Sequence, residues 1–529
     1  MKLDGKRLPN GWALCIVHDV VSPDVAHSPP AGDRDFTYID ISSIDNSSKQ
    51  IADPKTIKTS EAPTRARQHV RTGDVLVSMT RPNLNAVALV PPTLDQAVAS
   101  TGFCVVRTNS IEPRWLFYLV QSQDFVREMS ELVQGVMYPA VRPKDILSFE
   151  MPLAPLPEQH RIVAEIEKHL TRLDVAAASL KLAQAKLKRY RAAVLQAACE
   201  GRLVPTEADI AHAEGRDYEP ADLLLERILK ERRARWEDAE LEKMRANGKE
   251  PKDDRWKAKY AKPLAAEAEG LPGLPEGWVW GTVEQLTADM QNGLYKPTSA
   301  YGSGIPIIRI DDFQDGAVPT REELKKVLVD EKEEGKYELA GGDLLVNRVN
   351  SPSHLGKSLV VTEAHLPALF ESNMMRLRLV GPRDGEWIAM VTRSQDGRAR
   401  LTRDAKWAVN QASINQQDVA STYIPIPPTD EQRRILLEVE RRLSLTQQLS
   451  AALLHCVKRA ERLRQAILKA ALEGMLVSQD PDDEPADALL ERIRAESTQQ
   501  TSPSSRRSRR SRSAEAKAAQ MHLEEARSE

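Results

Sequence analysis

The sequence is poor in the residues that define several classes of protein. Its 529 residues include four cysteines, which lie far apart without a Cys-x-x-Cys pair, so neither a disulfide framework nor a zinc site is indicated. Aromatic residues make up only 5% of the chain. No stretch approaches the roughly eighteen apolar residues of a membrane span, and the first residues contain no apolar signal-peptide core. We therefore expect a soluble, cytoplasmic protein that contacts no membrane.

An excess of positive charge is also missing. The 74 lysine and arginine residues are balanced by 77 acidic residues, which gives a formal charge of −3. This balance excludes a globally basic nucleic-acid binder but leaves room for local basic faces. The length predicts three or four structural units at about 150 residues each.

Catalytic motifs are absent as well. The chain contains no His-Glu-x-x-His metal motif and no Gly-x-Ser-x-Gly nucleophile motif. It also lacks the Pro-Pro tetrapeptide of amino-methyltransferases. The segment SPSHLGKS (351–358) ends like a phosphate-binding loop, but serine replaces the first glycine. We therefore expect no metal and no cofactor in this chain.

The most informative feature present is an internal repeat. Residues 153–204 align with residues 426–477 at a constant offset of 273 without a gap, with 20 identities in 52 positions. The matched ends are PLPEQHRI with PTDEQRRI and LQAACEGRLV with LKAALEGMLV. A second pair, EPADLLLERI (219–228) and EPADALLERI (484–493), follows at an offset of 265. Weaker echoes, LPNGW (8–12) and LPEGW (274–278), precede each copy. The chain therefore contains one unit twice: a variable domain of about 150 residues followed by a helical segment.

Each helical segment carries a heptad pattern with apolar residues at alternating spacings of three and four. This pattern predicts two long helices that pair with each other as an antiparallel coiled coil with pseudo-twofold symmetry. Packing of each helix on its own domain, or dimerisation, is the alternative. The predicted seam residues are Ile166, Leu170, Leu173, Ala177, Leu180, Gln184, Leu187 and Val194 in the first helix, and Val439, Leu443, Thr446, Ser450, Leu453, Val457, Ala460 and Ile467 in the second.

The two variable regions, 1–152 and 271–425, are rich in short β-type runs between turn residues, such as DVLVSMT (74–80) and DLLVNRV (343–349). Each region also predicts a helix, around residues 112–134 and around residues 386–403. We interpret them as two α+β domains.

Polar loops in both domains suit contact with DNA. Arginine and lysine can bond guanine, asparagine and glutamine can pair with adenine, and basic residues also bind phosphates. Ordinary solvated turns are the alternative for any single residue. One group of candidates follows the Gly-Asp-x-Leu-Val strands: Arg81, Asn83 and Asn85 in the first domain, and Arg348, Asn350, Ser353, His354 and Lys357 in the second. The other group precedes the long helices: Tyr138, Arg142 and Lys144 in the first domain, and Asn410, Gln416 and Gln417 in the second.

Two variable domains, each followed by a helix that opens with Pro-x-x-Glu-Gln-x-Arg-Ile and closes with Glu-Gly-x-Leu-Val, resemble the specificity subunit of Type I restriction–modification systems. The resemblance covers about residues 8–495. It implies two target recognition domains, each reading half of a split sequence in double-stranded DNA. It also implies helices that set the spacing and dock adenine methyltransferase (modification) subunits. S-adenosylmethionine, ATP and Mg would be held by those and by the restriction/translocase subunits, and this chain would be non-catalytic.

The repeat and the resemblance together predict six segments. Two parts lie outside the core of the resemblance: residues 230–270 of the charged helical linker, and a tail whose Ser/Arg run should be disordered and solvated or, alternatively, an auxiliary DNA contact. The segments are the first recognition domain (1–152), the first coiled-coil helix (153–204), the linker (205–270), the second recognition domain (271–425), the second coiled-coil helix (426–495) and the basic tail (496–529).

Two other classes of function were weighed. A coiled-coil adaptor whose variable domains bind protein would have the same organisation. A methylase fused to its own recognition domains is disfavoured by the missing motifs. Neighbouring genes for a methyltransferase and a translocase would favour the DNA-reading interpretation over the adaptor.

Overall fold

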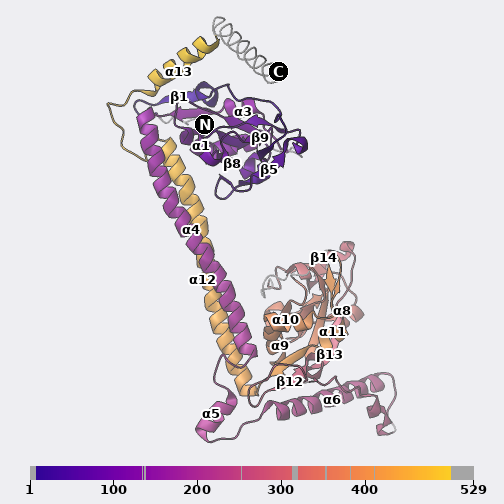
Figure 1. Cartoon of the computed structure of the whole chain (residues 1–529). Coiled ribbons are helices and arrows are strands. Elements are labelled where there is room, and N and C mark those ends of the chain that lie inside the picture. The colour runs from indigo at the N-terminus through magenta and orange to yellow at the C-terminus, as the bar shows by residue number, and fades with distance from the viewer. Residues whose placement is uncertain are drawn as a thin grey trace, which may run out of the picture. The chain divides into compact units, whose positions relative to one another are not determined.

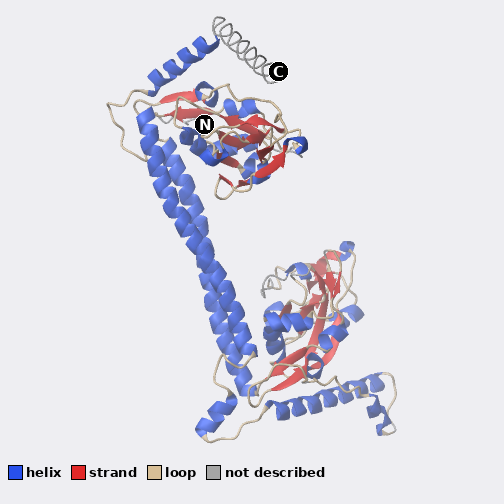
Figure 2. Ribbon diagram, viewed as in Figure 1, coloured by secondary structure: helices blue, strands red, loops and turns tan. Residues whose placement is uncertain are grey.

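The computed structural model describes residues 8–133, 135, 139–251, 253–267, 269–312, 320–351, 354–381, 383–409 and 411–501. The chain divides into two compact units, one made of residues 1–181 with 454–529 and the other of residues 182–453. The division cuts both long helices, α4 (Leu156–Cys199) and α12 (Thr429–Leu472), so each unit holds part of each (Figure 1). The predicted α+β class with two long helices is confirmed (Figure 2).

The domain of the first unit is built from small sheets with three helices around them. Its sheets, in spatial order, are β1 (Ala13–Ile16) with β11 (Glu150–Leu153); β5 (Lys55–Lys58), β2 (Asp35–Ile39), β9 (Val98–Ser100) and β6 (Ala66–His69); β10 (Phe103–Val106), β7 (Val75–Ser78) and β8 (Val87–Leu89); and β3 (Ile44–Asp45) with β4 (Gln50–Ile51). Its helices are α1 (Pro113–Leu119), α2 (Gln123–Glu131) and α3 (Pro143–Leu147).

The domain of the second unit has related sheets and one additional hairpin. Its sheets are β12 (Val279–Thr282) with β23 (Tyr423–Ile426); β13 (Thr287–Asn292), β20 (Met374–Leu379), β16 (Leu344–Asn347) and β18 (Ser358–Val360); β15 (Lys326–Val327), β14 (Tyr301–Ile308) and β19 (Leu369–Phe370); and β17 (Val349–Asn350), β22 (Ala412–Ser413) and β21 (Lys406–Trp407). Its helices are α7 (Val283–Leu286), α8 (Glu331–Tyr337), α9 (Asp384–Arg393), α10 (Gln395–Leu401) and α11 (Gln416–Ala420).

The two domains share a topology that their sequences barely show. In each domain, a strand from the first third of the domain pairs in parallel with a later strand: β2 pairs with β9, and β14 pairs with β19. In each, two tryptophan rings pack edge to face: Trp12 on Trp115 at 5.6 Å, and Trp278 on Trp387 at 5.9 Å. The repeat therefore extends through the variable domains.

The single helix predicted near residues 112–134, like that near 386–403, is instead two short helices. The hydroxyl of Ser122 caps α2 by accepting the amide of Phe125 at 3.3 Å, and Ser394 caps α10 by accepting the amide of Gly397 at 3.0 Å. Serine at these positions ends one helix and begins the next. The first expectation also extended to residue 134, which lies outside the described residues.

The two long helices have the same length, 44 residues each, as the ungapped repeat required. In the first unit, the opening turns of α4 share a core with the closing turns of α12, where Leu170 joins Leu468. In the second unit, the pairing is reversed, since Val194 near the end of α4 shares a core with Val439 near the start of α12. The helices are therefore antiparallel within each unit.

The predicted seam is also found. All its residues are buried or half-buried, whereas most residues between them in the middle of each helix are exposed. Two polar residues of the seam form hydrogen bonds within their own helix. The Thr446 hydroxyl donates to the Leu443 carbonyl, and the Ser450 hydroxyl donates to the Thr446 carbonyl. Arg191 and its repeat counterpart Arg464 continue the seam as half-buried residues.

The closing turn of each long helix packs on the opening loop of the other repeat. Gly201, after α4, lies against the Leu-Pro-Glu-Gly-Trp loop of the second domain, where a Cβ would come within 2.5 Å of Pro275 Cγ. Gly474, after α12, lies in the same way against Pro9 of the first domain, also at 2.5 Å. Both glycines have positive φ, 66° and 69°. Any side chain would therefore be strained and would clash at these positions.

The segments that follow these glycines also contact the domain of the other repeat. The amide of Ala221 donates to the Gly277 carbonyl, and the amide of Ala486 donates to that of Gly11, both at 2.8 Å. Ala221 begins α6 (Ala221–Ala246), and Ala486 begins α13 (Ala486–Thr501). The eight-residue change in repeat offset equals the length of α5 (Glu207–Glu214), which precedes α6.

A buried carboxylate in the first turn of each long helix accepts a hydrogen bond from another segment of the same unit. The indole of Trp12 donates to Glu158 Oε2 at 3.0 Å, and both residues are buried. Burial raises the pKa of Glu158 above its ordinary value of 4.5, even though the Trp12 hydrogen bond opposes the shift. In the second unit, the carboxylate of Glu431 accepts the amide of Glu207 at 2.9 Å, and burial raises its pKa as well.

Glu158→Ala should lower the free energy of unfolding by about 1–3 kcal/mol, because it leaves the buried Trp12 indole without an acceptor. Glu158→Gln should retain most of the stability, since an amide oxygen still accepts the bond. The wild type should also lose stability as pH rises from 4.5 toward the raised pKa, because the unfolded state releases its proton first, and the glutamine variant should lack that loss. Urea titrations across pH measure both effects.

Glu167→Ala is the matched control on the same helix, since this carboxylate is 41% exposed and pairs with Arg114 at 3.4 Å. It should change stability by no more than about 0.5 kcal/mol. Equal losses for Glu158→Ala and Glu167→Ala would contradict a special role for the buried bond.

Candidate nucleic-acid interface

In the first domain, the two polar loops that the sequence placed far apart lie side by side. Thr80 and Ala140 form a β-bridge. The amide of Arg81 donates to the Pro139 carbonyl at 2.8 Å, and the amide of Val141 donates to that of Met79 at 2.9 Å. The loop after β7 and the loop before α3 therefore form one surface.

The second domain joins its two loops in the same way, through strands. β17, directly after β16, pairs with β22, so that Val349 faces Ser413 and Asn350 faces Ala412. The amide of Ile414 donates to the Arg348 carbonyl at 2.8 Å. β21 then extends this sheet on the other side of β22.

The structure places the described candidate residues at this paired-loop surface or beside it, with different degrees of exposure. Tyr138, Ser353 and Asn410 lie outside the described residues. The exposed candidates are Arg81, Asn83, Arg142, Lys144, Gln416 and Gln417, and the half-buried ones are Asn85, Arg348, Asn350, His354 and Lys357.

Several of the half-buried candidates also hold the loops in shape. Asn85 Nδ2 donates to the Val120 carbonyl at 2.7 Å, and Arg348 Nη1 donates to the Ser372 carbonyl at 2.9 Å. The side-chain oxygen of Asn350 accepts the amide of Ser351 at 2.7 Å. These bonds fix the loop backbone and occupy part of each side chain's hydrogen-bonding capacity.

A basic groove in the first unit brings Asn83 and Asn85 close to the last turns of α12. Its volume is about 1250 Å³, and its lining holds six basic and two acidic side chains. No sequence motif pointed to it, because its residues come from four separate segments. The charged residues are Lys49, Arg127, Lys458, Arg462, Arg464 and Lys469, with Asp124 and Glu461. Such a lining suits an anionic backbone.

Lys49 is a half-buried cation of this groove. Its Nζ donates to the Asn85 carbonyl at 2.5 Å. Burial, with a smaller contribution from Arg464, lowers the pKa of Lys49 from 10.5 to about 8. The ammonium is therefore poised to lose its charge just above neutral pH.

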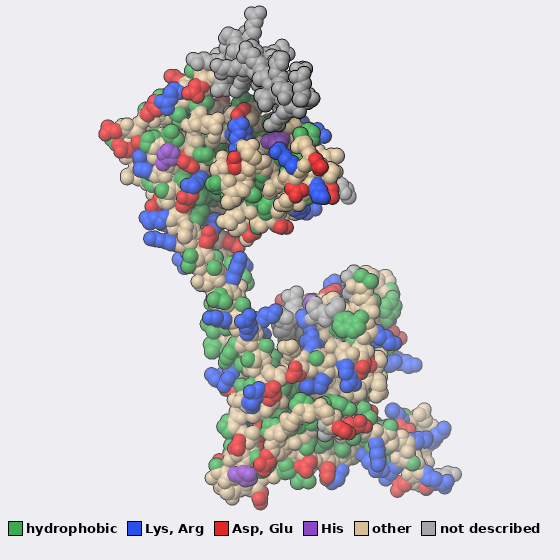
Figure 3. Space-filling view, in the orientation of Figure 1, with side chains coloured by type: hydrophobic (Ala, Val, Ile, Leu, Met, Phe, Trp, Pro, Cys, Tyr) green, Lys and Arg blue, Asp and Glu red, His purple; other side chains and the backbone are tan. Residues whose placement is uncertain are grey.

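The two arginines that interrupt the apolar seam, Arg464 and Arg191, interact with other charged side chains in the first and second unit respectively. Arg464 forms an ion pair with Asp174 of α4 and lines the basic groove. In the second unit, burial and then the charge of Arg191 lower the pKa of Arg393. Arg393 donates to the Ser358 carbonyl at 3.5 Å, and Arg398 donates to that of Leu355 at 2.9 Å. These two side chains hold the loop that carries His354 and Lys357. Lysine and arginine side chains also gather along the paired helices (Figure 3).

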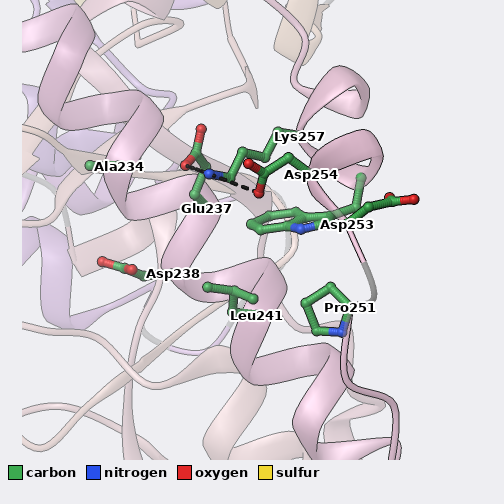
Figure 4. Close-up of a pocket in the computed structure, with 9 residues that line it drawn as sticks. Ala234, Glu237, Asp238, Leu241, Pro251, Asp253, Asp254 and Lys257 are labelled. Carbon is green, nitrogen blue, oxygen red and sulfur yellow. Dashed lines mark ion pairs between the residues drawn. The ribbon is translucent and has the colours of Figure 1, made fainter.

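A different pocket, of about 480 Å³, lies between α6 and the short helix at Asp254–Lys259 (Figure 4). Lys257 crosses it, 3.6 Å from Glu237 and 3.2 Å from Asp254. Asp238 and Asp253 add two more carboxylates to the lining. An acidic lining repels phosphate, so this pocket is no part of the candidate interface.

Two further kinds of site were sought in the described ranges. No group of three or more histidine, cysteine, aspartate or glutamate residues there has the geometry to hold a metal ion. No helix among those residues is both long and apolar enough to span a bilayer.

The chain is similar to known proteins of one kind. No family model matches the chain. The Type I restriction enzyme StySPI specificity subunit of Salmonella potsdam is 24% identical over 396 residues, covering 73% of this chain and 72% of the relative. The EcoKI specificity subunit of Escherichia coli (strain K12) is 24% identical over 392 residues, covering 72% and 71%.

A solved structure is similar along most of the chain. It comes from work on complex assembly and conformational transition of the type I R-M system, and its TM-score is 0.64 at 26% identity. The match covers 89% of this chain and all of the other.

The titration of Lys49 gives a prediction for the basic groove. Binding of a random-sequence DNA duplex should weaken from pH 7 to pH 9, as the ammonium with a pKa of about 8 loses its proton. Loss of one phosphate contact should reduce the salt-dependence slope by about one. Fluorescence anisotropy at several salt concentrations measures this slope.

Two variants of the same position serve as controls. Lys49→Arg keeps its charge throughout and should bind equally at both pH values, whereas Lys49→Gln should bind at pH 7 as the wild type does at pH 9. The same pH dependence in Lys49→Arg would rule out this lysine as the titrating group.

Proposed function

We propose that this chain, which belongs to the family of Type I restriction enzyme specificity subunits, reads a split DNA sequence through its two domains. Each domain would read one half of the target. One observation carries this proposal: in both domains, two polar loops distant in sequence are joined through their backbones into one surface. A chain with two such surfaces in related domains is suited to a target in two parts.

The paired helices would set the spacing between half-sites and dock the modification subunits. Equal helix lengths of 44 residues support this role, because a change in only one helix would break the seam. At 1.5 Å per residue, each helix is about 66 Å long.

Chemistry is proposed to reside in the partner subunits, and this chain is proposed to be non-catalytic and free of cofactors. Adenine methyltransferase subunits would bind S-adenosylmethionine, and restriction/translocase subunits would use ATP and Mg. The complex would act in the cytoplasm on double-stranded DNA. The relatives do not favour the alternative of an adaptor whose domains bind protein.

Exchange of residues 8–152 for the first domain of a related subunit should change one half of the methylated sequence and leave the other unchanged. The reason is that each domain has its own core and its own pair of loops. Mapping of methylated adenines across a genome reads both halves at once. A change in both halves, or in neither, would contradict independent reading.

Lengthening both helices should widen the gap in the target. Seven residues inserted between Leu180 and Leu187 and seven between Ser450 and Val457 keep the seam in phase. They add about 10 Å, or about three base pairs. Methylation mapping gives the new gap. Insertion of five residues at both positions rotates the seam out of register and should destabilise the chain. An unchanged gap in a folded, active seven-residue variant would leave the helices as a docking surface only.

A further inference from the structure

The three-stranded sheet β17–β22–β21 carries a large exposed side chain that the proposed function does not yet use. Trp407 on the edge strand β21 is 61% exposed. It pairs with Ala412 of β22, and Ala412 pairs with Asn350 of β17 on its other side. Directly opposed residues point to the same face of a sheet, so Trp407 and the candidate base-reading Asn350 share one face.

The distance between these two residues suits a DNA site. Neighbouring strands lie about 4.8 Å apart, so two strand spacings separate Asn350 from Trp407 by about 10 Å. This is about the rise of three base pairs. One half-site can therefore be contacted by both residues.

The surroundings of Trp407 are polar. Lys406, beside it on β21, and Gln411, beyond the turn, are both exposed. Asp404 is paired with Arg403 at 3.1 Å. Among the described residues of this hairpin, Val409 is the other large exposed apolar side chain, at 99%. A protein-binding face needs a broad apolar patch. Trp407 and Val409 alone do not form such a patch, and an exposed indole on a polar surface that also carries Asn350 suits stacking on a base.

Resting on the proposed function, we propose that Trp407 stacks on a base of the second half-site and so helps to position this domain on DNA. The indole would insert beside a base that is partly unstacked from its neighbour, as apolar wedges do in duplex DNA, and would contact the π face of that base without an ionic bond. A stacked base changes affinity by about 5- to 150-fold, and stacking tolerates many sequences. Asn350 and its neighbours would supply base identity, and Trp407 would supply position and affinity.

The test uses the chain assembled with its modification subunits and duplexes that carry its mapped target sequence. Trp407→Ala should weaken binding by about 5- to 150-fold without changing the slope of affinity against salt concentration. Trp407→Phe should recover most of the affinity. Lys406→Ala, a control from the same strand and opposite face, should change neither the affinity nor the salt slope.

A fluorescent base then locates the contact. 2-Aminopurine is placed at each position of the second half-site in turn, and its emission is compared between wild type and Trp407→Ala. A difference at one or two adjacent positions supports stacking. Equal emission at every position, equal affinity of the two proteins, or a reduced salt slope in Trp407→Ala would overturn the proposal.

Two further outcomes separate this proposal from its premise. Weaker assembly of Trp407→Ala with the modification subunits in the absence of DNA, with unchanged DNA affinity, would assign the indole to a protein contact and overturn stacking. Failure of the wild-type complex to prefer any sequence would contradict the proposed function itself, and the stacking role with it.

Discussion

The structure depends on a buried contact between the start of each domain and a long helix. Trp12 donates to the buried Glu158 at the first turn of α4, and the same indole lies against Gly474 after α12. One residue therefore ties together the first domain, the start of one helix and the end of the other. The arrangement recurs in the second unit, where Trp278 lies against Gly201 and Pro275. Since each helix ends on the domain of the other repeat, the larger hydrophobic core of each unit contains residues of both repeats.

Ion pairs also join each long helix to the segment that follows the other long helix. Arg161 binds Asp483 and Arg434 binds Glu207, both at 2.6 Å, at matched positions of the two helices. Each pair joins the first turns of a helix to the segment that follows the other helix. A buried charge is costly unless it is paired, so these contacts favour one register of the antiparallel helices. Register in turn fixes which residues of α12 face the first domain.

The candidate interface depends on that register. Arg464 breaks the apolar seam and lines the basic groove, and its repeat counterpart Arg191 lowers the pKa of Arg393 in the second unit. The reading loops come from the domains, whereas much of the positive charge comes from the helices. Such a division matches DNA recognition, in which base contacts specify and phosphate contacts position. The overall charge of −3 conceals this arrangement because acidic residues gather elsewhere, as in the pocket beside α6.

The sequence by itself determined the repeat, the equal helices, the heptad seam and the polar loops, because periodicity and identity are local properties of a chain. Only the tertiary structure decided that the two loops of each domain share one surface, since backbone pairing between Thr80 and Ala140, or Asn350 and Ala412, leaves no local pattern. The same holds for the split of each predicted helix at Ser122 and Ser394, and for the groove around Lys49. These features depend on contacts between residues far apart in sequence, whose energies no single segment encodes.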